Sequence, residues 1–138
     1  MEAFADYGHA LLSVALYALI AQVLNALTGI RKGSLNLQPG ETLIADYEDP
    51  SYRLDRTYMN SIEMIGFYIA LVFAAVLAGA SPFWVNLFAT LGVLFRIATN
   101  VIYLRKIGAG YGGLRTMMVI GASICNIGLF VLVLVAVF

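Results

Sequence analysis

The chain has 138 residues, of which 62% are hydrophobic and 12% are charged, and its mean hydropathy is +0.89. Values this high exclude an ordinary soluble domain and indicate an integral membrane protein. Eight basic and eight acidic residues cancel, so the chain lacks the overall basic field that would predict nucleic acid as a partner. Its function therefore has to be sought in the positions of its few charges.

The first predicted membrane span covers residues 9–31. At about 1.5 Å per residue, this helix is long enough to cross a hydrocarbon core of about 30 Å. Within it, Gln22, Asn25 and Gly29 share one helical face, where two amides and a small residue favour contact with another helix. We therefore expect this face to be used in helix packing, with ligand contact as the alternative.

The residues that most often bind metals are too few for a metal site. His9 is the single histidine and Cys125 the single cysteine, and they lie in different apolar segments. A lone histidine without nearby acidic residues is not a zinc site, and a lone cysteine cannot form an intrachain disulfide. We predict no metal, an interfacial His9 and a Cys125 packed in the core.

Helix-start signals divide the rest of the chain into three more spans. After a polar connection, Asp49-Pro50 combines an N-cap residue with proline at the first helical position, and Ser81-Pro82 repeats the combination. These signals predict helices that begin at Pro50 and Pro82 and pack as a tight antiparallel hairpin. The last three predicted spans are residues 50–80, 82–106 and 114–137.

Polar side chains interrupt the apolar character of the second span. Arg56, Asn60 and Glu63 fall within about 60° of one another on a helix, so they form one polar stripe. A charge at hydrocarbon depth costs about 2.5–3.5 kcal/mol on insertion scales, so the stripe should face protein or water rather than lipid. Such residues usually mark a functional site.

The third span repeats the stripe with Arg96, Asn100 and Tyr103. Counted from the hairpin turn, Glu63 lies at about 27 Å and Arg96 at about 22 Å along their helices. The two stripes should therefore meet, and a Glu63–Arg96 ion pair is expected. If this pair forms, both residues serve packing rather than ligand binding.

Basic residues also predict an orientation. They flank the first and third connections, whereas the termini and the second connection have none; these residues are Arg31, Lys32, Arg53, Arg56, Arg105, Lys106 and Arg115. By the positive-inside rule, both connections face the cytoplasm and both termini lie on the opposite side. The polar stripes would then open to the cytoplasm.

These motifs resemble a known family, the membrane-associated proteins in eicosanoid and glutathione metabolism (MAPEG). Asp55-Arg56-x3-Asn60-x2-Glu63 is similar to the family's Glu-Arg followed by Asn-x2-Glu, with aspartate in place of the first glutamate. The segment from Arg96 to Tyr103 resembles its Arg-x6-Tyr pattern. Arg115 resembles its fourth-helix arginine, at a slightly longer spacing.

The resemblance implies an all-α integral membrane fold, a four-helix bundle that assembles as a homotrimer, with glutathione held between subunits. Glutathione carries two carboxylates and a thiol, so its site needs cations for the carboxylates and a positive group near the sulfur. The expected glutathione-binding residues are Arg31, Arg53, Arg56, Asn60, Glu63 and Arg96. The expected catalytic residues are Tyr103, a phenolic donor, and Arg115, which would stabilise the thiolate.

The function expected from this resemblance is a glutathione-dependent transferase or peroxidase that acts on hydrophobic electrophiles or lipid hydroperoxides arriving through the bilayer. A lipid-binding scaffold of the same family, without chemistry, is one alternative. Another is a small proton-coupled exporter with Glu63 as its carrier carboxylate, although the nearby arginines would hold that carboxylate ionised. At single positions, other roles stay open. Arg31 and Lys32 can equally be topology signals, Arg53 can equally be a solvated charge or an anionic-lipid contact, and Tyr103 can be an interfacial tyrosine.

Overall fold

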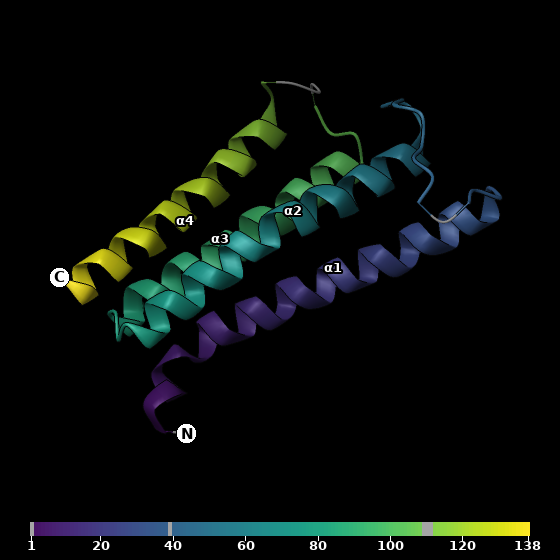
Figure 1. Cartoon of the computed structure of the whole chain (residues 1–138). Coiled ribbons are helices and arrows are strands. Elements are labelled where there is room, and N and C mark those ends of the chain that lie inside the picture. Colours follow the sequence, from purple (N-terminus) through teal and green to yellow (C-terminus); the bar gives the residue numbers. More distant parts are fainter. Residues whose placement is uncertain (1, 39, 109–111) are drawn as a thin grey trace.

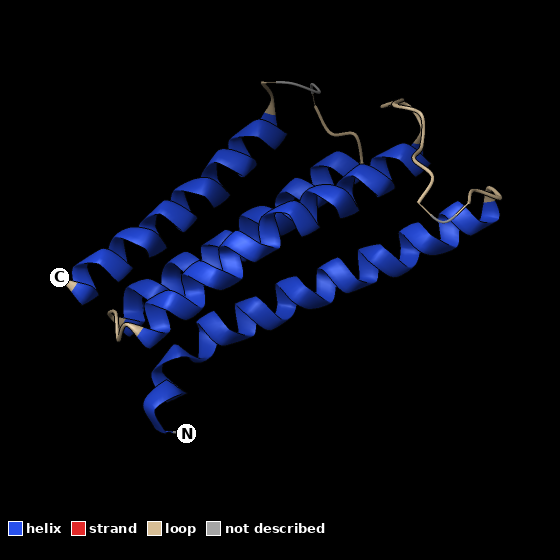
Figure 2. Cartoon of the chain, viewed as in Figure 1, coloured by secondary structure: helices blue, strands red, loops and turns tan. Residues whose placement is uncertain are grey.

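The computed structural model describes residues 2–38, 40–108 and 112–138. All regular structure among these residues is helical (Figure 2). A short 3₁₀ segment, η1, precedes four long α-helices, and each of the four is long and apolar enough to cross a membrane. The elements are η1 (Glu2–Tyr7), α1 (Gly8–Ser34), α2 (Pro50–Leu77), α3 (Pro82–Leu104) and α4 (Leu114–Val137).

The four described helices run alternately up and down (Figure 1). Both chain termini and the turn between α2 and α3 lie at one end of the bundle. The C-terminal ends of α1 and α3 and the N-terminal ends of α2 and α4 lie at the other end, which we call the connection end. The polar stripes predicted on α2 and α3 therefore belong to the same half of the molecule.

The second and third helices begin where the sequence predicts, at Pro50 and Pro82. The Asp49 side chain accepts a hydrogen bond from the Ser51 backbone N–H at 2.8 Å, as expected for an N-cap. Ser81 differs, because its side chain makes no capping hydrogen bond. The Ser81 backbone carbonyl accepts a hydrogen bond from Val85 N–H at 3.1 Å. The start of α3 is therefore determined by Pro82 and by backbone hydrogen bonds, without a side-chain cap.

Two helices end a little earlier than predicted, α2 at Leu77 rather than residue 80 and α3 at Leu104 rather than residue 106. Left-handed residues explain both ends: Gly79 has φ 69° and Lys106 has φ 54°. Backbone bonds from Ala80 N–H to the Ala75 carbonyl (3.0 Å) and from Ile107 N–H to the Ile102 carbonyl (2.9 Å) complete two Schellman motifs. α1 runs beyond the predicted residue 31 to Ser34 and ends the same way, with Asn36 at φ 57°.

The apolar core lies between α1, α2 and α3 toward the terminal end of the bundle. It is built from small and β-branched side chains together with three buried tyrosines. Each tyrosine hydroxyl donates to a backbone carbonyl: Tyr7 to Ala80 at 2.6 Å, Tyr17 to Ser61 at 3.1 Å and Tyr68 to Ala89 at 2.8 Å. A buried hydroxyl without a partner would be costly, so these bonds fix how the helices face one another.

α3 and α4 pack closely through glycines. A Cβ at Gly121 would lie 2.9 Å from the Phe95 ring, and a Cβ at Gly128 would lie 2.9 Å from the Phe88 ring. Cys125, between them, is buried. These small residues let α4 approach α3 closely.

The expected helix contact through Gln22, Asn25 and Gly29 is wrong within one subunit. All three residues are exposed on the surface of α1. The buried side of α1 carries Tyr17, Leu24 and other residues at three- and four-residue spacing. The amides come one position after buried residues, about 100° further around the helix, so they point outward.

Candidate functional site

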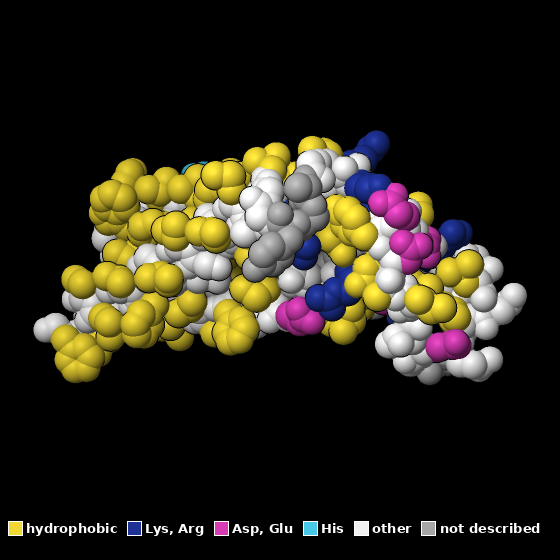
Figure 3. All heavy atoms as spheres, turned by 90° about the horizontal axis from the view of Figure 1, so that it is seen from above, with side chains coloured by type: hydrophobic (Ala, Val, Ile, Leu, Met, Phe, Trp, Pro, Cys, Tyr) yellow, Lys and Arg dark blue, Asp and Glu magenta, His cyan; other side chains and the backbone are white. Residues whose placement is uncertain are grey.

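Charged side chains gather at the connection end. Figure 3 shows Lys, Arg, Asp and Glu side chains clustered toward one end of a face that is otherwise largely hydrophobic. The same end carries the polar stripes of α2 and α3 and the first turn of α4. On this face of the described residues, basic and acidic side chains lie close together at this end and not elsewhere.

A small cavity lies where α2, α3 and α4 meet at this end. Its volume is about 10 Å³, close to the space that one water molecule needs. The lining side chains are all polar: Arg56, Thr57 and Asn60 from α2, Thr99, Asn100 and Tyr103 from α3, and Arg115 from α4. Four of the predicted site residues, Arg56, Asn60, Tyr103 and Arg115, thus come together.

Arg115 and Tyr103 are in direct contact. The guanidinium carbon of Arg115 lies 4.2 Å from the centre of the Tyr103 ring, a short cation–π distance. Tyr47 packs on the same ring, with the two ring centres 5.3 Å apart. The Arg115 cation therefore packs on the Tyr103 ring beside the cavity that both residues line.

Glu63 pairs with Arg56 of the same helix. Arg56 Nη1 and Glu63 Oε1 are 3.8 Å apart, and the two side chains are 39% and 50% exposed. The predicted stripe on α2 is confirmed by this contact, but the expected Glu63–Arg96 ion pair is wrong. Among the described residues, the cation within ion-pair distance of the exposed Glu63 carboxylate is Arg56, two turns earlier on the same helix, and not Arg96.

Arg96 instead donates from Nη1 to Asn60 Oδ1 at 2.5 Å. Only 3% of Arg96 is exposed, and its guanidinium carbon lies 5.9 Å from the centre of the Tyr17 ring. An amide oxygen and an aromatic face therefore stabilise this buried cation in place of a carboxylate. Arg96 holds Asn60 in position beside the cavity.

A family model described as the MAPEG family matches residues 8–135 of this sequence. The match extends from the start of α1 nearly to the end of α4. The chain belongs to the MAPEG family. A search of curated proteins finds no match to this sequence.

Membership in MAPEG places the chain among the membrane-associated proteins of eicosanoid and glutathione metabolism, whose fold is a membrane four-helix bundle. The observed helices agree with that fold: each of α1 to α4 is long and apolar enough to span a bilayer. The protein is an integral, multi-pass membrane protein.

Like Glu63 and Arg96, two further predicted site residues of this MAPEG protein do not line the cavity. These two residues are Arg31 and Arg53. Arg31 Nε donates to Ser51 Oγ at 2.8 Å. Arg53 Nη1 donates to the carbonyls of Tyr47 (2.8 Å) and Glu48 (2.9 Å), and its Nε donates to the Leu104 carbonyl at 3.3 Å. Arg53 thereby ties α2 to the preceding segment and to the end of α3, which is a structural role.

Asp55, the residue that departs from the MAPEG pattern, is also paired. Its Oδ1 lies 2.9 Å from Lys32 Nζ, and the Asp55 side chain is only 11% exposed. The pair joins the end of α1 to the first turns of α2. This position therefore retains a carboxylate, and that carboxylate forms an ion pair between α1 and α2.

Several polar residues beside the MAPEG site were missed by the sequence reasoning. Tyr17 on α1 contacts Arg96, and Thr57 and Thr99 line the cavity. One signal could have indicated Tyr17, since a tyrosine in the middle of an apolar span needs a partner for its hydroxyl. The threonines gave no such signal, because their hydroxyls bond to carbonyls of their own helices.

Proposed function

We propose that this MAPEG protein is a glutathione-dependent membrane transferase or peroxidase that acts on hydrophobic electrophiles or lipid hydroperoxides at the cytoplasmic interface. The observation that carries the proposal is the meeting of Arg56, Asn60, Tyr103 and Arg115 around one cavity, each from a position that the family motif marks. Two cations, an amide and a phenol are the groups that a thiol with two carboxylates requires.

In this proposal, the residues have different roles. Arg56 binds a glutathione carboxylate, and Asn60, positioned by Arg96, binds a peptide group of glutathione. Glu63 accepts from the glutathione amine. Arg115 lies beside the sulfur, where a fixed positive charge favours the thiolate over the thiol, and Tyr103 orients Arg115 by contact with its guanidinium.

A cavity of about 10 Å³ is far too small for a tripeptide. Glutathione would therefore lie over the outer side of the cavity, where Arg56 and Glu63 are partly exposed. That position lies on the surface of a single subunit, so a neighbouring subunit would be needed to enclose the ligand. This supports a homotrimer with glutathione between subunits, in which Arg31 of a neighbour could provide a further cation.

The thiolate then reacts with a hydrophobic partner supplied by the bilayer. With an electrophilic carbon, a sulfur–carbon bond forms and the leaving group departs or an epoxide ring opens. With a lipid hydroperoxide, two glutathione molecules supply two electrons, and the products are the alcohol, water and glutathione disulfide. Both reactions need the thiolate as nucleophile, so stabilisation of the thiolate is the shared requirement.

The deciding experiment is ultraviolet detection of thiolate when glutathione is added to the purified protein in detergent. The parent protein should form thiolate near neutral pH, although a free thiol has a pKa near 8.5. Arg115→Ala should lose thiolate formation and turnover while it retains much of the glutathione affinity. Arg115→Lys should recover part of the thiolate signal, since the charge remains but the planar fork does not.

Arg56→Ala is the matched control for Arg115→Ala, because it removes the same functional group from the same cavity. It should weaken glutathione binding, measured by equilibrium dialysis. Glutathione binding without thiolate in the parent protein would contradict the enzyme and support the lipid-binding scaffold. If the parent protein does not bind glutathione, then neither Arg56 as the carboxylate-binding residue nor Arg115 as the thiolate-stabilising residue can be correct.

A further inference from the structure

A short segment that we call the strap, residues 46–49, lies directly before the first turn of α2. The side chains of Asp46 and Glu48 are exposed, whereas that of Tyr47 is half-buried. The Tyr47 ring packs on the ring of Tyr103, with the ring centres 5.3 Å apart and the ring planes 52° apart. The strap therefore directs one aromatic side chain toward a residue that lines the polar cavity.

The strap is fixed through its backbone. Asp46 Oδ1 accepts from the Glu48 N–H at 2.9 Å, and the Asp46 carbonyl accepts from the Asp49 N–H at 3.2 Å. Arg53 Nη1, from α2, donates to the carbonyls of Tyr47 at 2.8 Å and Glu48 at 2.9 Å. These bonds hold the backbone of Tyr47 in a turn, so they also fix the direction in which its side chain leaves the strap.

Two further contacts join the strap to the end of α3. Arg53 Nε donates to the Leu104 carbonyl at 3.3 Å, and Lys106 forms an ion pair with Glu48. Arg53 thus binds both the strap and the last residue of α3. Because Tyr103 comes directly before that residue, the same contacts fix the backbone that carries Tyr103.

Tyr103 depends on support of this kind. It lies in the last turn of α3, where helices fray. Nevertheless, Tyr103 is only 7% exposed, and the guanidinium carbon of Arg115 lies 4.2 Å from the centre of its ring. A cation–π contact requires the ring to stay within about 6 Å of the cation, so any rotation of Tyr103 would also release Arg115.

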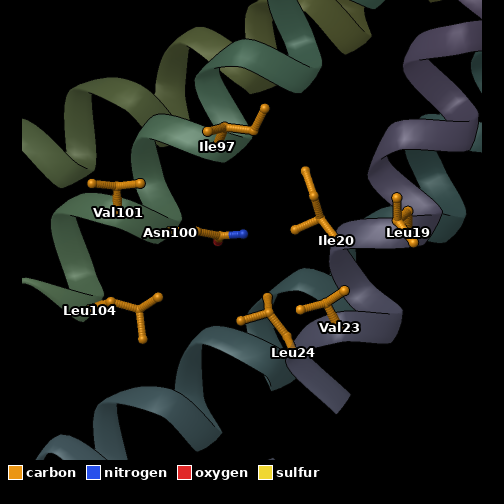
Figure 4. Close-up of a pocket in the computed structure, with 8 residues that line it drawn as sticks. All are labelled: Leu19, Ile20, Val23, Leu24, Ile97, Asn100, Val101 and Leu104. Atoms are coloured by element: carbon orange, nitrogen blue, oxygen red, sulfur yellow. The ribbon is translucent and has the colours of Figure 1, made fainter. Parts of the chain in front are cut away.

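The side of the cavity at Asn100 offers no equivalent support. Asn100 lines both the cavity and an apolar groove between α1 and α3, which Figure 4 shows. The other residues that line this groove are aliphatic, so none of them supplies an aromatic ring that could pack on Tyr103. Within the described part of the chain, the aromatic ring that packs on Tyr103 is Tyr47.

We propose that Tyr47 is a positioning residue: by packing on Tyr103 it fixes the place of the Arg115 guanidinium, and Arg53 in turn fixes Tyr47. The chemical consequence rests on the proposed function, in which Arg115 stabilises the thiolate of glutathione. Tyr47 does not line the cavity, so it acts through Tyr103. A preorganised cation stabilises a thiolate more than a mobile one, because no reorganisation is needed when the charge forms.

The first test needs no glutathione. Protons above an aromatic ring resonate upfield, so the side-chain protons of Arg115 should be shifted upfield in nuclear magnetic resonance spectra of the arginine-labelled protein in detergent. Arg115→Lys assigns the signal, and Tyr103→Leu defines its complete loss. Tyr47→Ala should lose most of the upfield shift, whereas Tyr47→Phe should retain it because the ring remains.

The second test measures the midpoint pH at which bound glutathione becomes a thiolate, followed by ultraviolet absorbance. Tyr47→Ala should raise this midpoint by about one unit, which means about tenfold less thiolate below the midpoint. Glutathione affinity measured below the midpoint should stay close to that of the parent, and Tyr47→Phe should titrate as the parent does. A merely structural role of Tyr47 would lower the stability of the protein without moving the midpoint.

Two further variants complete the comparison. Arg53→Gln leaves the Tyr47 ring in place but removes the guanidinium that holds the strap, so it should change both signals in the same direction as Tyr47→Ala. It decides the question if Tyr47→Ala does not fold. Leu43→Ala is the matched control, because it removes another half-buried side chain of the same connection that does not pack on Tyr103, and it should leave both signals unchanged.

The proposal is wrong if the parent shows no upfield shift of Arg115, or if the shift survives in both Tyr47→Ala and Arg53→Gln. An equal change in Leu43→Ala would also overturn it, since general loosening of the connection would then explain the result. If glutathione forms no thiolate in the parent but Tyr47→Ala still loses the shift, the proposed function fails and the positioning of Arg115 stands. If thiolate forms with the same midpoint in parent and Tyr47→Ala, the positioning role fails and the proposed function stands.

Discussion

Two charged residues on neighbouring helices, Arg96 and Glu63, differ sharply in environment. Arg96 is 3% exposed and is held by Asn60, whereas the Glu63 side chain is 50% exposed and lies 3.8 Å from Arg56. A buried cation depends on each of its partners, because water cannot replace them. An exposed ion pair contributes little, since water and salt screen it.

Asn60→Ala should therefore lower the free energy of unfolding by about 2 kcal/mol, since it leaves the Arg96 guanidinium without its amide partner. Glu63→Gln should change it by less than about 1 kcal/mol. Both values can be measured by denaturant titration in detergent without ligand. Equal losses for the two variants would mean that Glu63 contributes as much to stability as Asn60 does, and would contradict the assignment of Asn60 as the main partner of Arg96.

The N-cap of α2 gives a pH prediction outside the membrane spans. The Ser51 backbone N–H donates to Asp49 and holds the pKa of that carboxyl below its ordinary value of 3.8. A lowered pKa in the folded state means that the ionised cap stabilises the fold above pH 3.8, and that this stabilisation is lost as the pH falls through the lower, folded-state pKa.

Acidification below pH 3.8 should therefore weaken the first turn of α2, seen as faster hydrogen exchange at Ser51 relative to a mid-helix amide of α2. Asp49→Asn should keep most of the cap and lose its pH dependence. Asp49→Ala should weaken the turn at every pH. If hydrogen exchange at Ser51 depends on pH in Asp49→Asn as it does in the parent protein, a group other than Asp49 causes the pH dependence.

At the scale of helices, α3 and α4 depend on two glycines for their close approach. Gly121→Ala would push a methyl group to 2.9 Å from the Phe95 ring, closer than carbon atoms can pack. We expect it to destabilise the protein by about 1–3 kcal/mol. Gly66→Ala is the control, since a Cβ there meets nothing within 4 Å, and it should stabilise α2 by about 0.5–1 kcal/mol.

Thermal unfolding in detergent would measure both changes. If Gly121→Ala is neutral, the Phe95 ring moves aside at little cost and the glycine is not required for packing. If Gly66→Ala also destabilises, the open side of α2 is covered by another subunit. That second result would locate a contact between subunits.

The positions of the helices could be predicted because each depends on local chemistry. Pro50 and Pro82 mark helix starts through their fixed φ, and the length of the apolar runs marks the spans. The stripe of Arg56, Asn60 and Glu63 follows from helical geometry alone, and the Arg56–Glu63 contact confirms it. In each case, the information lies within a few residues of sequence.

Contacts between helices could not be predicted in the same way. The sequence places Glu63 and Asn60 within one turn of each other, but it does not say which of them faces α3, and this decides which one meets Arg96. The contact between Tyr17 and Arg96 depends on the separation of α1 and α3, which is set by packing along both helices. Rotation and separation of helices are properties of the whole bundle.

At the scale of the whole molecule, charge is concentrated at the connection end (Figure 3). From the positive-inside rule, we predict that this end faces the cytoplasm and that both termini lie on the other side. Ile44→Cys, at a position that is 88% exposed, should react with a membrane-impermeant thiol reagent added from the cytoplasmic side. Phe138→Cys should react only from the opposite side, with Cys125 replaced by Ala in both variants.

The reverse labelling pattern would move the proposed site to the other side of the membrane. It would also contradict the assignment of glutathione as a cytoplasmic substrate. Ile44 and Phe138 lie at opposite ends of the described bundle, because three helices, α2, α3 and α4, separate them. Labelling of both positions from the same side would therefore contradict this odd number of membrane crossings, and not only the orientation.

The outward face of α1 bears on assembly. Gln22 and Asn25 are exposed there, within a span whose surroundings are apolar. Amides that face lipid are unfavourable, and a neighbouring subunit could bind them. We predict a homotrimer, measured by native mass spectrometry from mild detergent. Only monomers under these conditions would contradict it, and Gln22→Leu with Asn25→Leu should weaken the trimer if α1 is part of the interface.

The turn between α2 and α3 also matters for how the protein is made. Residues Ala78 to Ser81 carry no charged side chain, and the carbonyls of Ala75 and Val76 already accept from the turn's N–H groups. A growing chain must carry this tip across the bilayer, and no charged side chain at the turn opposes its passage. We therefore expect α2 and α3 to be inserted together as one hairpin during synthesis, and the charged residues at the connection end would then remain on the side from which the chain enters the membrane.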